Sequence, residues 1–248
     1  MLALIGLGLD GTEISAKGLS HVAGSDEVFA EFYTSLPCVD MCDIERIVGK
    51  PITVLTREDV EERELPLERA RDGIVAFLVM GDPLVATTHI SLAARAREEG
   101  IPLAICHASS IYSAIGSTGL MLYKFGKSAS IVYPEKNYFP KSFYETIVQN
   151  KKRGLHTLLF LDLKADRDIY MNPVDGMRLL RAADEETIVS TIIVASRIGW
   201  KSEKIVYGEV SELSSLDASF FGPPPHCIVV PGEMHFAEEE YVELFRYG

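Results

Sequence analysis

A chain of 248 residues, 47% hydrophobic and 24% charged, is long enough for one large globular domain or two smaller ones. Its net charge of −12 argues against a general nucleic-acid or anionic-membrane surface, because the acidic excess repels phosphate. The N-terminal apolar run is too short, and lacks the basic flank, for a signal peptide or a membrane span, so we expect a cytoplasmic protein. The four cysteines form no Cys-x-x-Cys pair, and we expect packing thiols and no metal site.

The N-terminal half alternates strand and helix patterns. Leu2–Ile5 is typical of a buried strand, and glycines and a helical pattern from Thr12 to Val22 follow it. A charged segment covers residues 57–64, and a helix is predicted at Thr88–Glu99. The remaining strands expected here are Val28–Tyr33, Ile52–Leu55, Ile74–Met80 and Pro102–Cys106.

The regular pattern gives way to small and hydroxyl residues at 107–119, and we place a domain junction there, with domains at 1–110 and 111–248. The second domain is expected to contain a mixed sheet, since its strands are β-branched and less evenly separated by helices. In the last helix, Glu238–Glu240 is interpreted as a solvated face and Tyr241, Leu244 and Phe245 as the apolar stripe. The strands predicted are Ser128–Tyr133, Leu155–Asp162, Thr187–Ala195, Lys204–Gly208 and His226–Val230, with helices at Lys141–Lys151, Pro173–Ala183 and Ala237–Arg246.

The first loop fits the dinucleotide fingerprint Gly-x-Gly-x-x-Gly at residues 6–11, and Glu31 follows about twenty residues later. This pattern favours a nicotinamide-dependent oxidoreductase. Two carboxylates weaken that interpretation, because Asp10 lies inside the turn and Glu13 shortly after it, where a pyrophosphate would bind. A cationic or neutral ligand suits this loop better.

A second loop candidate is the turn Gly81-Asp82-Pro83, which directly follows the apolar run 74–80 and precedes a helical pattern. Ligands of parallel α/β sheets bind outside the carboxyl ends of the strands, so Asp82 and the free backbone groups beside it indicate a pocket. The alternative is an ordinary turn, since these three residue types favour turns in any context.

The sequence contains no nucleophile elbow, zinc motif, Walker loop or paired-carboxylate signature. A reaction that needs neither a protein nucleophile nor a metal is consistent with this, and methyl transfer from a sulfonium donor is one. The donor carries its own activation, so the protein mainly has to hold the acceptor in line with the methyl group.

Several segments spread over almost the whole chain resemble the diphthine synthase family. The Gly-Asp-Pro turn alone indicates only the wider class of tetrapyrrole-methylase-like enzymes, and the Ala-Thr-Thr-His extension with the Phe-Tyr-Thr-Ser segment narrows it to the diphthine branch. The segments that carry the resemblance are residues 6–9, 28–35, 55–60, 81–89, 110–114, 123–129 and 224–226.

This resemblance implies two α/β domains with a donor-binding cleft between them and S-adenosylmethionine as methyl donor, released as S-adenosylhomocysteine. It implies methylation of the amino group of a 3-amino-3-carboxypropyl-modified histidine on translation elongation factor 2, a step of diphthamide biosynthesis. We favour the archaeal type of reaction, which adds three methyl groups, over the eukaryotic type, which also methylates the carboxylate. A homodimer is expected from the family.

The resemblance also implies a set of donor-binding residues. Asp82 would accept hydrogen bonds from the ribose or the ammonium of the donor, and His226 would bind the adenine or the donor carboxylate. Ile198 lies in Ala195–Gly199, which departs from the family's usual Leu-Ala-Arg-Ala-Gly, so we expect a backbone contact there. The full set is Leu9, Asp82, Val85, Ser110, Ile111, Leu161, Ile198 and His226.

The acceptor side is less defined by the sequence. Tyr112, Lys124 and Lys127 are candidates for its lining, and Tyr112 and Tyr123 would suit a quaternary nitrogen. No general base is assigned, and solvent is an alternative proton acceptor. The alternative functions are a tetrapyrrole-precursor methylase of the same fold, the oxidoreductase above, and a binding module without turnover.

Overall fold

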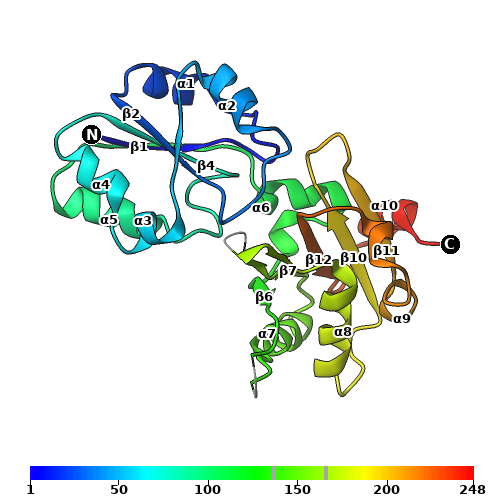
Figure 1. Cartoon of the computed structure of the whole chain (residues 1–248). Coiled ribbons are helices and arrows are strands. Elements are labelled where there is room, and N and C mark those ends of the chain that lie inside the picture. Colours follow the sequence, from blue (N-terminus) through cyan, green and yellow to red (C-terminus); the bar gives the residue numbers. More distant parts are fainter. Residues whose placement is uncertain (136–137, 165–166) are drawn as a thin grey trace. The chain divides into compact units, whose positions relative to one another are not determined.

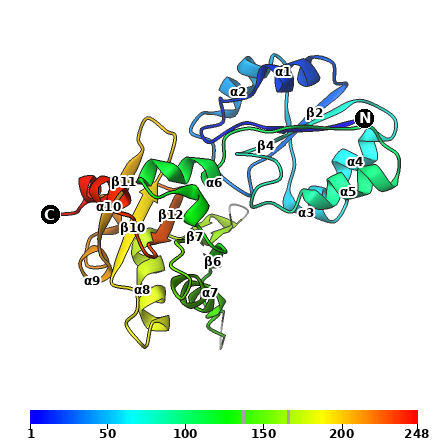
Figure 2. The ribbon, with the colours of Figure 1, turned by 180° about the vertical axis from the view of Figure 1, so that it is seen from behind.

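The computed structural model describes residues 1–135, 138–164 and 167–248. The chain divides into two compact units, Met1–Ile111 with Lys164–Asp168, and Tyr112–Leu163 with Ile169–Gly248. Figures 1 and 2 show the main segment of the first unit in blue through cyan to blue-green, and the second unit mainly in green to red. The sequence-based division at residues 110 and 111 stays a proposal about the domains.

The first unit is a parallel sheet covered on both faces. Its strand order is β3-β2-β4-β1-β5. Both faces are apolar because helices cover each of them, α1 and α2 on one side and α3, α4 and α5 on the other (Figure 1). The strands are β1 Leu2–Gly6, β2 Glu27–Glu31, β3 Thr53–Val54, β4 Val75–Val79 and β5 Leu103–Cys106, and the helices are α1 Ala16–Ala23, α2 Met41–Val48, α3 Arg57–Glu61, α4 Leu65–Ala70 and α5 Ile90–Glu98.

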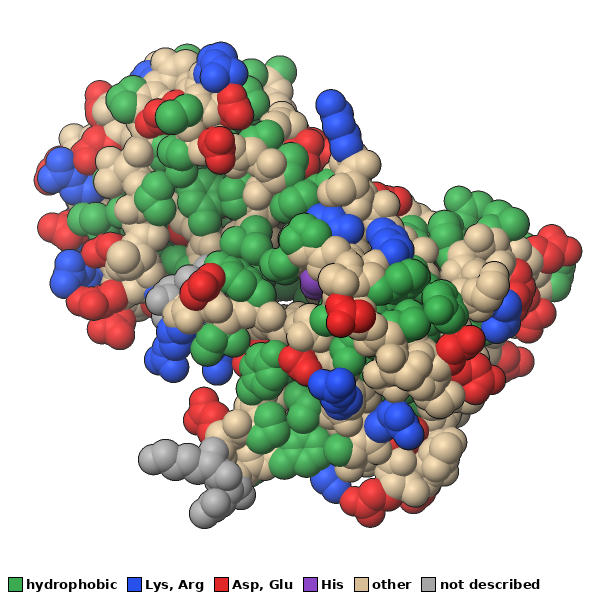
Figure 3. All heavy atoms as spheres, turned by 45° about the vertical axis from the view of Figure 1, so that its right-hand side comes forward, with side chains coloured by type: hydrophobic (Ala, Val, Ile, Leu, Met, Phe, Trp, Pro, Cys, Tyr) green, Lys and Arg blue, Asp and Glu red, His purple; other side chains and the backbone are tan. Residues whose placement is uncertain are grey.

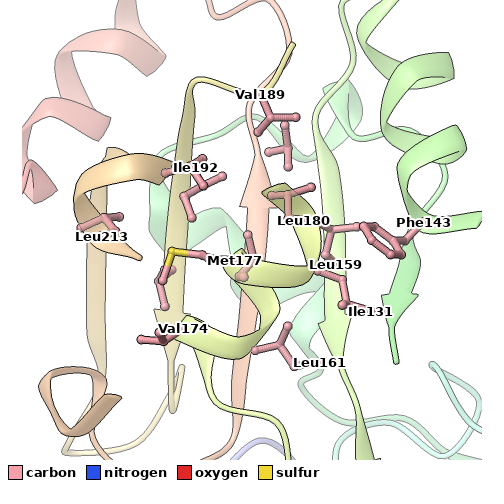
Figure 4. Close-up of a cluster of buried hydrophobic side chains, with 14 of the residues drawn as sticks. Ile131, Phe143, Leu159, Leu161, Val174, Met177, Leu180, Val189, Ile192 and Leu213 are labelled. Carbon is pink, nitrogen blue, oxygen red and sulfur yellow. The ribbon is translucent and has the colours of Figure 1, made fainter. Parts of the chain in front are cut away.

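The second unit contains a mixed sheet with the order β11-β10-β12-β7-β6, in which only β6 and β7 pair in parallel. Its largest core packs Met177 and Leu180 of helix α8 against strand residues such as Leu159 and Ile192 (Figure 4). The strands are β6 Ala129–Ile131, β7 Thr157–Leu161, β10 Thr191–Ser196, β11 Lys204–Glu209 and β12 His226–Val230, and the helices are α7 Ser142–Lys151, α8 Pro173–Ala183, α9 Val210–Leu213 and α10 Phe236–Val242.

Short elements complete the described chain. The helix α6 Ile111–Ala114 begins at the last residue of the first unit's main segment. The pair β8 Leu163–Lys164 and β9 Ile169–Tyr170 forms a two-stranded sheet. The 3-10 turns are η1 Ile115–Thr118, η2 Leu122–Lys124, η4 Ala218–Phe221 and η5 Glu243–Phe245.

The α/β class and the mixed second sheet agree with the sequence prediction, whereas several local predictions need correction, and the short helices α4 and α9 were not predicted. Helix α2 was missed, and the charged segment 57–64 contains α3, which a capping box between Thr56 and Asp59 begins. In the last helix, Glu239 and Glu240 are exposed as expected, whereas the expectation was wrong for Glu238 and for the apolar stripe, in which Tyr241 and Leu244 are exposed. Glu238 is fully buried, whereas Leu244 is 75% exposed.

Glu238 is buried because four donors satisfy its carboxylate. One oxygen accepts hydrogen bonds from the backbone N–H of Met121 at 2.7 Å and from His156 Nε2 at 3.0 Å. The other accepts from the backbone N–H of His235 and from Lys124 Nζ. Burial raises the pKa of Glu238, but these hydrogen bonds outweigh it and lower the pKa to about 2.

Loss of this charge is expected to destabilise the second unit. Glu238→Gln cannot accept all four hydrogen bonds and leaves Lys124 without its partner, so we expect the free energy of unfolding to fall by about 3 kcal/mol at pH 7. The exposed Glu240→Gln is the matched control and should change it by less than about 0.5 kcal/mol. Urea unfolding measures both.

The stability that Glu238 contributes should decrease as the pH falls. A carboxylate with a depressed folded pKa stabilises the fold above its unfolded pKa of 4.5, and this stabilisation is lost as the pH falls towards about 2. The gap between wild type and Glu238→Gln should therefore narrow in acid. A gap that stays constant down to pH 3 would contradict a buried carboxylate at this position.

Candidate active site

The glycine loop after β1 and the Gly-Asp-Pro turn after β4 pair directly with each other. Gly8 and Gly81 exchange two backbone hydrogen bonds, of 3.3 and 2.8 Å. Both residues have a positive φ, which glycine adopts without strain. A Cβ on Gly6 would lie 2.5 Å from the carbonyl oxygen of Gly81 and 2.7 Å from the Cβ of Ala108, so only glycine permits this approach.

Asp82 joins the loops that follow β4 and β5. It is 5% exposed. Its Oδ1 accepts from the backbone N–H of Leu84 at 3.0 Å, and its Oδ2 accepts from the backbone N–H of Ala108 at 3.3 Å and from His107 Nδ1 at 2.7 Å. These three bonds leave about one lone pair, on Oδ1, for a further donor. The first role of Asp82 is therefore to fix the loops, and any ligand contact is additional.

Backbone N–H groups of the glycine loop already donate hydrogen bonds to carboxylates of the same loop. The N–H of Leu9 donates to Glu13 Oε2 at 3.0 Å, and Ser109 Oγ donates to the same oxygen. Asp10 Oδ1 accepts from both the N–H and the hydroxyl of Thr12 at 2.7 Å. A pyrophosphate would need these donors and would meet two negative charges. The loop therefore suits a cationic ligand better than a dinucleotide.

Glu31, the second element of the dinucleotide alternative, is fully buried and holds the turn after β2. Its carboxylate accepts from the backbone N–H groups of Tyr33 and Thr34 at 3.0 and 3.1 Å, and from the Thr34 hydroxyl at 2.5 Å. Burial raises the pKa of Glu31 to about 7, and burial lowers that of His89, 3.8 Å away, to about 4. Both groups are internal, so Glu31 is not available to a ribose.

The first unit brings five predicted donor residues to one edge of its sheet. Leu9 follows β1, Asp82 and Val85 follow β4, and Ser110 and Ile111 follow β5, whose carboxyl ends all lie at that edge. This is the edge at which parallel α/β sheets bind ligands. Binding of the donor by these residues stays a prediction.

The second unit brings the other three predicted residues together. Leu161 ends β7, His226 begins β12, and continuation of the β7–β12 register from Cys227 and Phe160 places these two residues opposite each other. Ile198 lies in the turn that follows β10, the other neighbour of β12. The Leu161 side chain points into the core towards α8 (Figure 4), so a ligand would contact it chiefly through the backbone.

Arg197, which the sequence analysis did not select, fixes the two loops at this end of the second sheet. Its guanidinium donates to the carbonyl oxygens of Phe221 at 3.0 Å, of Pro223, and of Ser202 at 3.1 Å. Arg197 thereby holds the loop that leads into His226 against the turn that contains Ile198. The arginine shared with the family's Leu-Ala-Arg-Ala-Gly segment was the available signal for this role.

Two neighbouring polar atoms in the second unit are buried without a hydrogen-bond partner. Ser196 lies directly opposite His226 in the β10–β12 register, and the orphaned atoms are Ser196 Oγ and His226 Nδ1. His226 Nε2 donates to the carbonyl oxygen of Gly222 at 3.1 Å, so Nδ1 carries the lone pair. Burial, with Arg197 nearby, lowers the pKa of His226 to about 4. Orphaned polar atoms side by side indicate a ligand that supplies the missing hydrogen bonds.

The residues suggested for the acceptor side differ in whether their polar groups are already engaged within the protein. Lys124 forms an ion pair with Glu238 and is not a free cation. The Tyr112 hydroxyl is hydrogen-bonded to Ser128, whereas Tyr123 is 81% exposed. Contacts of these residues with an acceptor stay predictions.

No cluster of three or more His, Cys, Asp or Glu side chains suited to a metal ion occurs among residues 1–135, 138–164 and 167–248. In the same ranges no helix is long and apolar enough to cross a membrane. The face drawn in Figure 3 carries interspersed acidic, basic and hydrophobic side chains.

Comparison with known proteins agrees with this geometry. Residues 1–214 match the family model of the Tetrapyrrole (Corrin/Porphyrin) Methylases. The diphthine synthase of Methanococcus maripaludis strain C5 is 44% identical, over 97% of this chain and 96% of that protein. The diphthine synthase of Methanocaldococcus jannaschii is 43% identical over the same shares. A crystal structure of diphthine synthase superposes with a TM-score of 0.89 at 35% identity, covering 99% of this chain and 95% of that one.

The match of residues 1–214 to this family model shows a methylase of the tetrapyrrole methylase class. Within that class the chain belongs to the diphthine synthase family. The predictions of the family, the α/β fold, a methyltransferase activity in diphthamide biosynthesis and dependence on S-adenosylmethionine are thereby confirmed.

Proposed function

We propose that this chain transfers methyl groups from S-adenosylmethionine to the amino group of the 3-amino-3-carboxypropyl-modified histidine of translation elongation factor 2. The observation that carries the proposal is the identity of 43 to 44% with diphthine synthases over 97% of the chain. The eight predicted donor residues support it, since each unit gathers its own share at one end of its sheet.

The residues of the first unit fit the charge of the donor. S-Adenosylmethionine carries a sulfonium and an ammonium group, and it supplies an already activated methyl group. Glu13 and Asp82 place carboxylates at the carboxyl edge of the sheet, where they favour cations through charge. The lone pair that remains on Asp82 Oδ1 suits an ammonium or a ribose hydroxyl.

The residues of the second unit fit the polar groups of the nucleoside. His226 Nδ1 is an acceptor and stays neutral above about pH 4, so it cannot bind a carboxylate and instead suits the adenine amino group or a ribose hydroxyl. Ser196 Oγ can donate or accept beside it. We therefore assign His226 to the nucleoside and not to the carboxylate of the donor.

We also propose a homodimer and a cytoplasmic location, the latter because the acceptor is a translation factor. Support for self-association comes from large apolar side chains exposed in the C-terminal segment, Phe236 at 66%, Tyr241 at 47% and Leu244 at 75%. Light scattering after size exclusion should give twice the mass of 27.4 kDa. A monomer mass across micromolar concentrations would refute the dimer.

The reaction is tested by incubating the protein with labelled S-adenosylmethionine and elongation factor 2 whose histidine already carries the aminocarboxypropyl group. We expect mass spectrometry to find three methyl groups on that residue. Elongation factor 2 without the aminocarboxypropyl group is the matched control and should take none. Transfer to a tetrapyrrole precursor instead, or calorimetry that shows NAD bound in preference to S-adenosylhomocysteine, would overturn the proposal.

Ser196→Ala tests the donor assignment without disturbing the fold. It removes a buried hydroxyl that has no partner, so the stability of the ligand-free protein should stay unchanged or rise by about 1 kcal/mol. Affinity for S-adenosylhomocysteine should fall by about tenfold, the value of one hydrogen bond. Ser190→Ala, at an exposed position just before the same strand, is the control for calorimetry. Equal affinities of the two variants would remove Ser196 from the site.

A further inference from the structure

His107 and Asp82 form a pair in which a buried carboxylate orients an exposed imidazole. His107 Nδ1 lies 2.7 Å from Asp82 Oδ2, and the two side chains are 68% and 7% exposed. A carboxylate only accepts hydrogen bonds, so Nδ1 carries the hydrogen and the neutral ring presents its lone pair at Nε2. A base oriented by a third group in this way is the arrangement on which general base catalysis relies.

The pair lies among the loops that hold the predicted donor residues. His107 follows β5 directly, and the next residue, Ala108, contacts Gly6 at the end of β1 and donates to Asp82. The imidazole is therefore fixed at the carboxyl edge of the first sheet, where the methyl donor is proposed to bind. An acceptor nitrogen that reaches the methyl group must approach the same edge.

Neighbouring titratable groups are already engaged or inaccessible. Glu13 accepts from Leu9 and Ser109, and Lys17 donates to the carbonyl oxygen of Ile105. Glu31 and His89 are buried, with side chains that are not exposed. His107 combines an exposed ring with a lone pair and a fixed tautomer, which a proton acceptor for a bulky substrate requires.

We propose that His107, oriented by Asp82, accepts the proton that the acceptor ammonium must lose before each methyl transfer. This assignment rests on the proposed function, in which the acceptor is a primary amine. With this assignment His107 is a catalytic residue, whereas the sequence offered only solvent as the proton acceptor.

The step balances for each methyl group. An N–H bond of the acceptor ammonium breaks, its electron pair stays on nitrogen, and the proton moves to Nε2 of His107. The nitrogen lone pair then forms the bond to the methyl carbon, while the bond between that carbon and the donor sulfur breaks and leaves its pair on sulfur. The exposed imidazolium returns its proton to solvent. Three methylations release three protons, and the final quaternary nitrogen has none left to lose.

The test is His107→Gln in the full-length protein, with modified elongation factor 2 in single-turnover methylation. Glutamine keeps a polar side chain but cannot take a proton, so we expect the rate at pH 7 to fall by roughly hundredfold. The deficit should shrink by about tenfold for each added pH unit, because the acceptor amine then loses its proton to solvent. His21→Gln, on helix α1 of the same unit, should keep the wild-type rate and pH profile.

Two further measurements separate the possible failures. Calorimetry should show that His107→Gln binds S-adenosylhomocysteine with unchanged affinity. If the affinity falls by the same factor as the rate, His107 binds the donor and the role as base is overturned. Nitrogen-15 NMR of the wild type should show His107 with its hydrogen on Nδ1, and the opposite tautomer would also overturn it. Wild type that fails to methylate refutes the proposed function. An active wild type with an equally active His107→Gln refutes only this inference.

Discussion

The hydrogen bonds of one buried carboxylate, Asp82, organise the ligand edge of the first unit. They tie the turn after β4 to the segment after β5 across the end of β1, and the absence of a side chain on Gly6 allows these loops to meet. The positions of the predicted donor residues after β4 and β5 follow from this closure. The same carboxylate fixes the tautomer of His107, so one group both shapes the proposed donor site and prepares a proton acceptor beside it.

The two units offer different chemistry at the ends of their sheets. The first presents carboxylates and backbone groups, which favour positive charge. The second presents a neutral histidine and a hydroxyl whose Nδ1 and Oγ atoms are buried without hydrogen-bond partners, at the end of the sheet where Arg197 holds two loops together. The proposed donor carries cationic groups, which suit the carboxylates of the first unit. It also carries a neutral nucleoside, which suits the unpartnered histidine and serine atoms of the second unit. A dinucleotide has the same nucleoside end, but its anionic pyrophosphate would meet the carboxylates of the first unit.

Two further buried carboxylates, Glu238 and Glu31, are held by hydrogen bonds within their own units. Glu238 keeps its charge because four donors surround it, and it binds the η2 segment to helix α10. Glu31 has fewer donors and a raised pKa of about 7, and it stabilises the turn after β2. These carboxylates lie in patterns that suggested other roles, a solvated helix face and a ribose ligand. In both cases the surrounding hydrogen-bond donors allow the carboxylate to be buried.

The sequence alone determined the alternating strands, the glycine loop, the Gly-Asp-Pro turn and the family, because apolar period and turn chemistry are local properties. Tertiary structure decided which carboxylates are free. Glu31 was engaged by its own turn, Glu238 by segments more than a hundred residues away, and Asp82 by His107. Ser196 and His226 became a pair only through the β10–β12 register. Hydrogen-bond partners of this kind are set by strand order and loop closure, which neither spacing nor residue type specifies.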